Sequence, residues 1–337
     1  MPTVLDSLNA ALHQALARDQ RVIVIGEDVL DPYGGAFRVT RGLSEAYPNQ
    51  VITTPISEAG IVGVGSGMAL RGMRPVVEIM FGDFLALAAD QVINHAAKFR
   101  FMYNDQARVP LVIRTPMGGR RGYGPTHSQT LEKHFLGAPG LRILAPCAIS
   151  QPGELLLGAI FEDDDPVLFV ENKLLYLLPV QDPAVSEEVI IERSIITGSY
   201  APSYRLTVRG APPPALTLTT YGYMVELARQ AMLRLAYEDE IFVEVVAPTQ
   251  LAPFELDALW ASVNRTGCLV TVEEGTHDLG WGAEVLARAA EMFGPRLRAS
   301  RRLAALNQSV PASGALEKTA LPSVANLVDT CREIAHQ

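Results

Sequence analysis

Apolar positions along the chain repeat with two different periods, and the two periods alternate. Residues 4–17 place leucines at helical spacing, at Leu5, Leu8, Leu12 and Leu16. Residues 21–26 form a short apolar run that ends in a glycine, which is typical of a buried strand. Glu27 and Asp28 follow it, at the carboxyl end of the predicted strand, where α/β proteins place their chemistry.

The same alternation of strand and helix continues through most of the sequence. It predicts strands at residues 51–54, 76–80, 109–114, 142–145, 167–170, 215–220, 241–246 and 268–272. It predicts helices at residues 59–71, 84–103, 151–162, 224–236, 254–264, 282–292 and 323–336. Strands that alternate with helices indicate an α/β fold, with two domains that each have a parallel sheet covered by helices.

A change of composition divides the two series. Prolines gather in residues 180–214, with Pro212, Pro213 and Pro214 in succession, and such stretches favour domain boundaries. We therefore expect a first domain at residues 1–185, a linker at 186–214 and a second domain at 215–337.

Composition narrows the class of protein. The chain has 337 residues, of which 48% are hydrophobic and 19% are charged, and its net charge is -9. A nucleic-acid partner is not expected, because no basic cluster is visible, and no apolar run is long enough to span a membrane. Three widely spaced cysteines, Cys147, Cys268 and Cys331, are typical of a reducing compartment, so we expect a cytoplasmic protein.

The most informative run is residues 53–67, where a predicted strand ends and a glycine-rich helix begins. Ser57 is placed to cap this helix, and Glu58 lies in its first turn. The glycines from Gly63 have the spacing G-x-G-x-G, which is not the dinucleotide-binding pattern, and close helix packing explains them. Taken alone, Glu58 is an acid favoured by the helix dipole.

The run continues into a string of further motifs that together resemble one family. In order they are residues 82–84, 90–98, 109–114, 126–129, 139–141 and 165–167, within the first 180 residues. The string resembles the β subunits of 2-oxoacid dehydrogenase E1 components, within the wider transketolase-like family. The resemblance implies a pyrimidine-binding transketolase-like domain, a transketolase C-terminal domain, and thiamine diphosphate as the cofactor.

The resemblance assigns roles to four residues. Glu58 stands where the family's acid hydrogen-bonds N1′ of the aminopyrimidine and so promotes loss of the thiazolium C2 proton. Phe84 stands where an aromatic ring stacks on the aminopyrimidine, although ordinary core packing also explains it, and Ile56 offers backbone contacts to the same ring. His127 stands where a histidine faces the thiazolium and assists acyl transfer to a lipoyl group, although a solvated loop residue has the same sequence signature.

Two ions follow from the same resemblance. Potassium is expected among the backbone carbonyls of Leu111, Ala159, Asp163 and Asp165, although the acids at residues 162–165 also fit a solvated turn. Mg²⁺ binding in the superfamily uses a Gly-Asp-Gly segment, which this sequence lacks, so the Mg²⁺ ligands are expected from a partner chain. The partner is then an E1 α-type subunit in an α2β2 heterotetramer. Arg120 and Arg121, near His127, could meet a carboxylate substrate or the partner chain, but we expect them to be solvated.

The implied function is that of an E1 β subunit, which decarboxylates a 2-oxoacid such as pyruvate or a branched-chain 2-oxoacid and passes the acyl group to lipoyl-E2. Two alternatives stay open: a carboligase or acyl-transfer subunit that works without E2, and a non-catalytic scaffold subunit. Departures from the family pattern at residues 245–251, 274–284 and 306–311 keep the carboligase alternative open, because these segments lie where β subunits meet each other and the E2 core.

Overall fold

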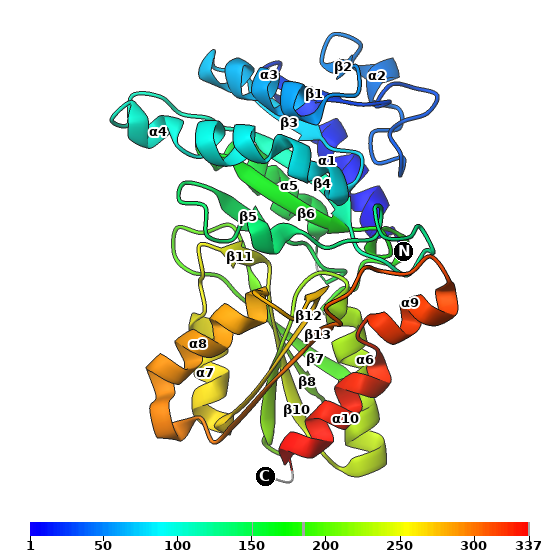
Figure 1. The fold of residues 1–337 in the computed structure, drawn as a ribbon, viewed down its shortest axis with the longest axis vertical. Helices are drawn as coiled ribbons and strands as arrows, with labels where there is room; N and C mark the ends of the chain where they lie inside the picture. Colours follow the sequence, from blue (N-terminus) through cyan, green and yellow to red (C-terminus); the bar gives the residue numbers. More distant parts are fainter. Residues whose placement is uncertain (150, 184–185, 336–337) are drawn as a thin grey trace.

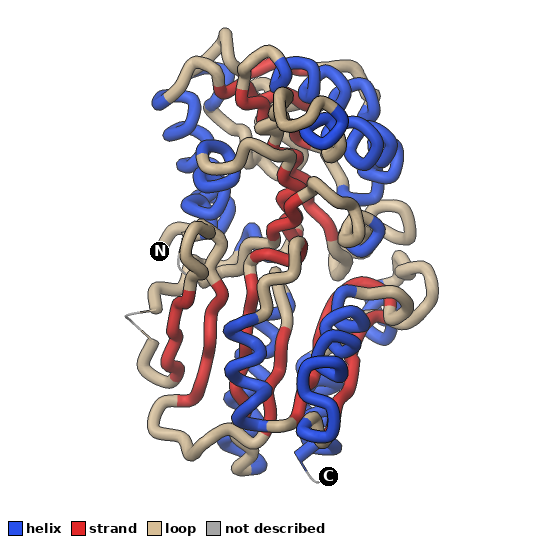
Figure 2. The backbone as a smooth tube through the Cα atoms, turned by 90° about the vertical axis from the view of Figure 1, so that its left-hand side faces the viewer, coloured by secondary structure: helices blue, strands red, loops and turns tan. Residues whose placement is uncertain are grey.

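The computed structural model of the chain has two α/β domains, which lie one after the other along its long axis (Figures 1 and 2). The structure describes residues 1–149, 151–183 and 186–335. The first domain contains a seven-stranded sheet, the first sheet, in the order β11-β5-β6-β4-β3-β1-β2. The second domain contains a six-stranded sheet, the second sheet, in the order β13-β12-β9-β10-β8-β7. Most neighbouring strands are parallel, so the predicted fold class is confirmed.

The first sheet is built from strands that are mostly buried on both faces, apart from the edge strand β2. Its strands are β2 (Val51–Thr53), β1 (Val22–Gly26), β3 (Arg74–Glu78), β4 (Val112–Met117), β6 (Val167–Asn172), β5 (Arg142–Leu144) and β11 (Gln250–Ala252). Alternate side chains point to opposite faces, so Val24 and Val76 pack with α1 (Val4–Arg18) and α5 (Pro152–Phe161). Ile25 and Val77 pack on the other face, with α3 (Glu58–Leu70). This two-sided burial explains the continuous apolar runs in the sequence.

The predicted helix at residues 84–103 is wrong as a single element. The chain forms instead a 3-10 helix η1 (Gly82–Ala88), a π-helical segment η2 (Gln91–Ala96) and the short α4 (Phe99–Met102). In η1 the buried residues Gly82, Leu85 and Ala88 recur every third position, which is the period of a 3-10 helix. The tighter winding therefore turns three residues of one short segment toward the sheet.

The second sheet includes residues that the sequence assigned to a linker. Its strands are β13 (Ala299–Ala305), β12 (Cys268–Thr276), β9 (Leu216–Thr219), β10 (Val243–Pro248), β8 (Ser203–Val208) and β7 (Val189–Ser194). Both β7 and β8 lie within residues 186–214 and form an antiparallel edge of this sheet, so the linker prediction is wrong over these strands. The prolines misled it because they flank β8, at Pro202 and at Pro212, without interrupting it.

Helices cover the second sheet on both faces. One face packs against α6 (Met224–Asp239) and α10 (Val324–Ala335), and the other against α7 (Asp257–Thr266) and α8 (Trp281–Phe293). The short elements are α2 (Leu43–Ala46), α9 (Gly314–Ala320), η3 (Glu132–His134), η4 (Leu175–Leu177) and η5 (Gly294–Arg296). Within the described residues, no helix has the length and apolar character that crossing a membrane requires.

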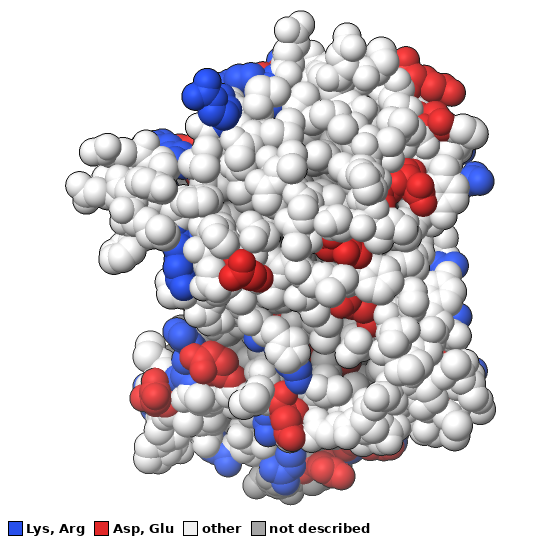
Figure 3. Space-filling view, turned by 45° about the horizontal axis from the view of Figure 1, so that its top comes forward, with Lys and Arg blue, Asp and Glu red and all other residues white. Residues whose placement is uncertain are grey.

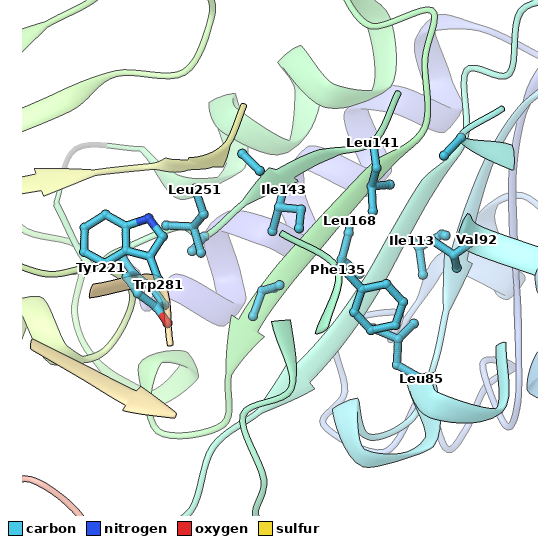
Figure 4. Packing of buried hydrophobic residues seen from close by; sticks show 14 of the residues in the cluster. Leu85, Val92, Ile113, Phe135, Leu141, Ile143, Leu168, Tyr221, Leu251 and Trp281 are labelled. Carbon is cyan, nitrogen blue, oxygen red and sulfur yellow. The ribbon is translucent and has the colours of Figure 1, made fainter. Parts of the chain in front are cut away.

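One apolar cluster contains residues of both domains. Leu251 of β11 belongs to the second half of the chain, yet β11 pairs with β5 of the first sheet. Leu251 and Trp281 belong to the same buried cluster as Ile143 and Leu168 of the first sheet (Figure 4). The two domains are therefore packed against each other, and this packing positions the loops that lie between them.

Candidate active site

The candidate site residues lie after the carboxyl ends of four neighbouring parallel strands. Glu27 follows β1, and Phe84 lies in η1 after β3. His127 lies in the loop after β4, and Lys173 follows β6 directly. Because β1, β3, β4 and β6 are adjacent in the sheet, residues distant in sequence converge on one edge.

Glu58 is the first residue of α3 and is buried, with 4% of its surface exposed. It makes no hydrogen bond or ion pair with any residue that the structure describes. Ser57 occupies the N-cap position, but its side chain makes no capping hydrogen bond, so that part of the prediction is wrong. A buried carboxyl without a protein partner is costly, and it is free to bond a ligand.

A second carboxyl faces Glu58. Glu27 is also buried, and its Oε1 has no hydrogen-bond partner. Burial raises the pKa of Glu27, and the negative charge of Glu58 raises it further. Glu27 was placed at a strand end by the sequence, but only the structure shows that it lies beside Glu58.

Ile56 precedes this acid pair and is exposed over 81% of its surface. Val64 on α3 and Leu87 in η1 are also large exposed apolar residues. In Figure 3 the upper part of the face shown, over the first domain, is largely free of charged side chains, which gather near its edges. Single exposed apolar residues are normal on a protein surface, whereas a contiguous apolar patch marks an interaction site.

The structure brings Phe84 and His127 together. Their ring centroids are 5.2 Å apart and nearly perpendicular, and Phe81 contacts the same imidazole at 4.8 Å. His127 Nδ1 lies 3.0 Å from the hydroxyl oxygen of Thr126. Within the described chain no hydrogen bond or ring contact links Glu58 to Phe84 or His127, so the site has an acid side and an aromatic side.

Lys173 is a site residue to which the sequence analysis gave no role. Its ammonium nitrogen donates a hydrogen bond of 2.7 Å to the backbone carbonyl of His127. Burial lowers the pKa of Lys173 to about 8. The one signal in the sequence is a lysine directly after an apolar strand, at a position where a buried charge is unexpected.

The start of the His127 loop is bound by acids from the second domain. Glu274 accepts a hydrogen bond of 2.6 Å from the backbone N–H of Gly119. Glu317 of α9 accepts one of 2.6 Å from Arg120 N–H and another of 3.1 Å from Gly122 N–H. Arg120 itself donates from Nη2 to the carbonyl of Pro322, at 2.6 Å. The expectation that Arg120 is solvated is therefore wrong, because its guanidinium connects the loop to the second domain.

A buried ion network lies next to the site but is complete in itself. Arg114, 1% exposed, donates to both carboxylate oxygens of Glu171 and to Glu78 Oε2, each at 2.8 Å. Tyr176 donates its hydroxyl to the same Glu171. Because the guanidinium hydrogen-bonds both acids and the phenol adds a bond to Glu171, this network is suited to holding strands β3, β4 and β6 together.

The acid turn after α5 is occupied by arginines. Arg74 donates from Nη1 to the backbone carbonyls of Ile160 and Asp163, at 2.8 and 3.0 Å. The carboxylates of Asp163 and Asp165 pair with Arg142 and Arg100. A guanidinium thus hydrogen-bonds Asp163, one of the carbonyls expected to bind potassium, and the arrangement does not by itself call for an ion. Among the described residues, no group of three or more His, Cys, Asp or Glu side chains is arranged to hold a metal.

Comparisons with known proteins agree with this geometry. Residues 1–178 match the family "transketolase, pyrimidine binding domain", and residues 208–327 match "transketolase, C-terminal domain". A solved split-gene transketolase, an inactive beta4 tetramer, superposes with a TM-score of 0.76 over 100% of this chain and 99% of its own, at 18% identity, which supports the fold alone.

Three curated relatives are similar over most of their length. Pyruvate dehydrogenase E1 component subunit beta-1 of Arabidopsis thaliana is 36% identical, over 99% of this chain and 90% of its own. The 2-oxoisovalerate dehydrogenase subunit beta of Pseudomonas aeruginosa is 38% identical, over 86% and 82%. The acetoin:2,6-dichlorophenolindophenol oxidoreductase subunit beta of Cupriavidus necator is 34% identical, over 97% and 95%.

The fold and the strand-end site define a chain of the transketolase class, with a pyrimidine-binding domain followed by a C-terminal domain. Within that class, the chain belongs to the family of β subunits of 2-oxoacid dehydrogenase E1 components. Membership in this family implies the use of thiamine diphosphate.

Proposed function

We propose that this chain is the β subunit of an E1 enzyme that decarboxylates a 2-oxoacid, such as pyruvate or a branched-chain 2-oxoacid, and transfers the acyl group to a lipoyl-bearing E2. The observation that carries the proposal is Glu58, a buried carboxyl with no protein partner at the start of α3. A scaffold subunit has no use for such a group, because a buried carboxylate destabilises the fold when it forms no hydrogen bond or ion pair.

The residues present fit the aminopyrimidine half of thiamine diphosphate. Glu58 has a free carboxyl for N1′, Phe84 has a half-buried aromatic ring for stacking, and the backbone at Ile56 lies in the exposed segment directly before Glu58. When bound, the cofactor supplies a nucleophilic carbon, C2 of its thiazolium ring. The task of Glu58 is to hold a proton at N1′, which requires a carboxyl fixed by its surroundings and shielded from water.

His127 is assigned to the second half of the reaction. Its ring contacts Phe81 and Phe84, and Nδ1 lies beside the Thr126 hydroxyl. The other ring nitrogen, Nε2, has no hydrogen-bond partner among the described residues. Histidine is the side chain that most often transfers a proton in general acid–base catalysis. We propose that His127 supplies the proton that a lipoyl sulfur takes up as its disulfide opens.

A partner chain completes the site in this proposal. Binding of the diphosphate and Mg²⁺ uses a Gly-Asp-Gly segment that this chain lacks, so an E1 α-type subunit supplies it within an α2β2 heterotetramer. The exposed Ile56, Val64 and Leu87 support a covered surface near Glu58. Cytoplasmic location is supported by three buried free cysteines, and potassium at the acid turn stays a prediction.

One observation favours a second candidate. The relative named for acetoin oxidation is similar to this chain at 34% identity, close to the 36% of the pyruvate dehydrogenase relative. The second candidate function is therefore that of a subunit that acts on acetoin, or joins acyl groups, with the same half of the site.

The test is a reconstitution with an α-type subunit that carries Gly-Asp-Gly. Pyruvate, branched-chain 2-oxoacids and acetoin are offered with ferricyanide as the electron acceptor, and then with a free lipoyl domain. Decarboxylation followed by acylation of the lipoyl domain supports the E1 proposal. Acetoin cleavage, or joining of the acyl group to an aldehyde without lipoyl acylation, supports the second candidate. Inactivity in every arm, with a partner proven to bind, returns the scaffold alternative.

The chain alone gives an independent control. Without the partner we expect no micromolar binding of thiamine diphosphate with Mg²⁺, because the charged diphosphate has no ligands here. Calorimetric titration of the isolated chain and of the complex measures this, and tight binding by the isolated chain contradicts the divided site.

A further inference from the structure

Lys173 is a buried cation whose ammonium group donates a hydrogen bond to one backbone atom. Its exposed surface is 0%, and its Nζ donates to the His127 carbonyl at 2.7 Å. The ammonium lies 5.3 Å from the ring centroid of Phe81 and 6.0 Å from that of Tyr123. Among the described residues it forms no salt bridge with a carboxylate.

This placement costs stability. Removing an ammonium from water is unfavourable by several kcal/mol unless charges or hydrogen bonds offset it, at order-of-magnitude level. Aromatic faces offset roughly 0.5–2 kcal/mol of that, and the carboxylates of Asp83, Glu274 and Glu317 also favour the charged form of Lys173. An apolar side chain of similar length is the cheaper way to fill this space, so packing alone does not account for a lysine at position 173.

The contact that lysine provides is at His127. The imidazole is bounded by Phe81 and Phe84 on its ring side, and its backbone carbonyl is fixed by Lys173. The hydrogen bond from Lys173 holds the backbone of residue 127, and the two phenyl rings bound the imidazole, so the position of the ring depends on both. The remaining contacts from the second domain reach the loop earlier, at Gly119, Arg120 and Gly122.

We propose that Lys173 is a positioning residue for His127, which sets the direction of the imidazole for proton delivery during acyl transfer. The inference rests on the proposed function of His127. Lys173 does not touch the substrate in this account, and it acts through the carbonyl of His127.

The chain offers a matched control. Lys133 also donates from Nζ to backbone carbonyls of the second domain, those of Asp278 at 2.7 Å and Thr276 at 3.3 Å, and to the Thr276 hydroxyl, and it has no contact with His127 among the described residues. Lys133→Met therefore removes the same kind of hydrogen bond at a place that the proposal leaves out.

The test compares two rates in the reconstituted complex: decarboxylation with ferricyanide, and acyl transfer to a free lipoyl domain. Lys173→Met should lower lipoyl transfer by about 10- to 100-fold, because a misplacement near 1 Å costs about that much. Ferricyanide decarboxylation should stay within about twofold of wild type, since electrons alone are taken up there. Lys173→Arg, which keeps a charged donor, should retain most of the transfer, and Lys133→Met should leave both rates within about twofold.

The double variant decides between positioning and mere packing. In a His127→Ala background, Lys173→Met should cost nothing further in lipoyl transfer, because there is no imidazole left to direct. Multiplying losses, or an equal fall of both rates in Lys173→Met, overturn the inference. If Lys173→Met fails to fold, Lys173→Gln and Lys173→Arg are compared in the same two backgrounds. If His127→Ala itself leaves lipoyl transfer unchanged, the proposed role of His127 fails first; if it separates the two rates and the Lys173 variants do not, only the inference fails.

Discussion

Two groups of buried glutamates lie at neighbouring strand ends of the first sheet, and they differ in what neutralises them. Glu78 and Glu171 share the guanidinium of Arg114, and their network is closed by hydrogen bonds. Glu27 and Glu58 face each other, and neither forms an ion pair within the described chain. The paired group is suited to stabilising the fold, whereas the unpaired group is suited to receiving a ligand, because its cost is not repaid within the chain.

The largest expected effect is on the unpaired group. Glu58→Gln should lower the rate of hydrogen–deuterium exchange at C2 of thiamine diphosphate by about 10²–10⁴-fold in the reconstituted complex. The amide keeps the size of the side chain but cannot share a proton with N1′. The unfolding free energy should not fall, because the Glu58 carboxylate has no hydrogen bond to lose and its charge opposes that of Glu27.

Glu78→Gln is the matched control for that variant. It removes a carboxylate from the paired group, so it should destabilise the fold and leave C2 exchange near the wild-type rate. Exchange in Glu58→Gln within about twofold of wild type, or an equal loss in Glu78→Gln, contradicts the division into two groups.

The next effect is on stability. Arg114→Met should lower the unfolding free energy by about 3–5 kcal/mol, since it leaves Glu78 and Glu171 buried without a counter-charge. Urea denaturation of the purified chain measures the difference. A loss below about 1 kcal/mol shows that the two acids find protons or water instead, and that the network does not hold the strands.

The sequence predicted the fold well where two-sided burial makes a continuous apolar run, as at Val22–Gly26 and Val167–Asn172. It failed at residues 84–103, because composition does not distinguish 3-10 and π winding from α-helix. It also failed at β7 and β8, where prolines lie outside the strands.

The site was predictable only in part. Motifs in the sequence suggested Glu58, Phe84 and His127, and the structure places the rings of Phe84 and His127 in contact. The roles of these residues stay predictions. Glu317 was invisible, because it lies 190 residues from His127 and binds backbone atoms that carry no sequence signal. Lys173 was missed because its role depends on one hydrogen bond across two strand ends.

The smallest effect concerns the pH dependence of stability, and it tests the unpaired group directly. Burial, and then the charge of Glu58, raise the pKa of Glu27 above its usual value of 4.5. Between 4.5 and the raised value the folded chain holds a proton that the unfolded chain has released, so the unfolding free energy falls as pH rises through this window, by at most about 1.4 kcal/mol per pH unit. Glu27→Gln binds no proton at this position, so its unfolding free energy, measured by urea denaturation, should fall less steeply than that of wild type in this window; the rest of the fall comes from other buried acids with a raised pKa, such as Glu132 and Glu273. Glu58→Gln should narrow the window, because it removes the second cause; an unchanged window in both variants shows that the two carboxyls do not interact.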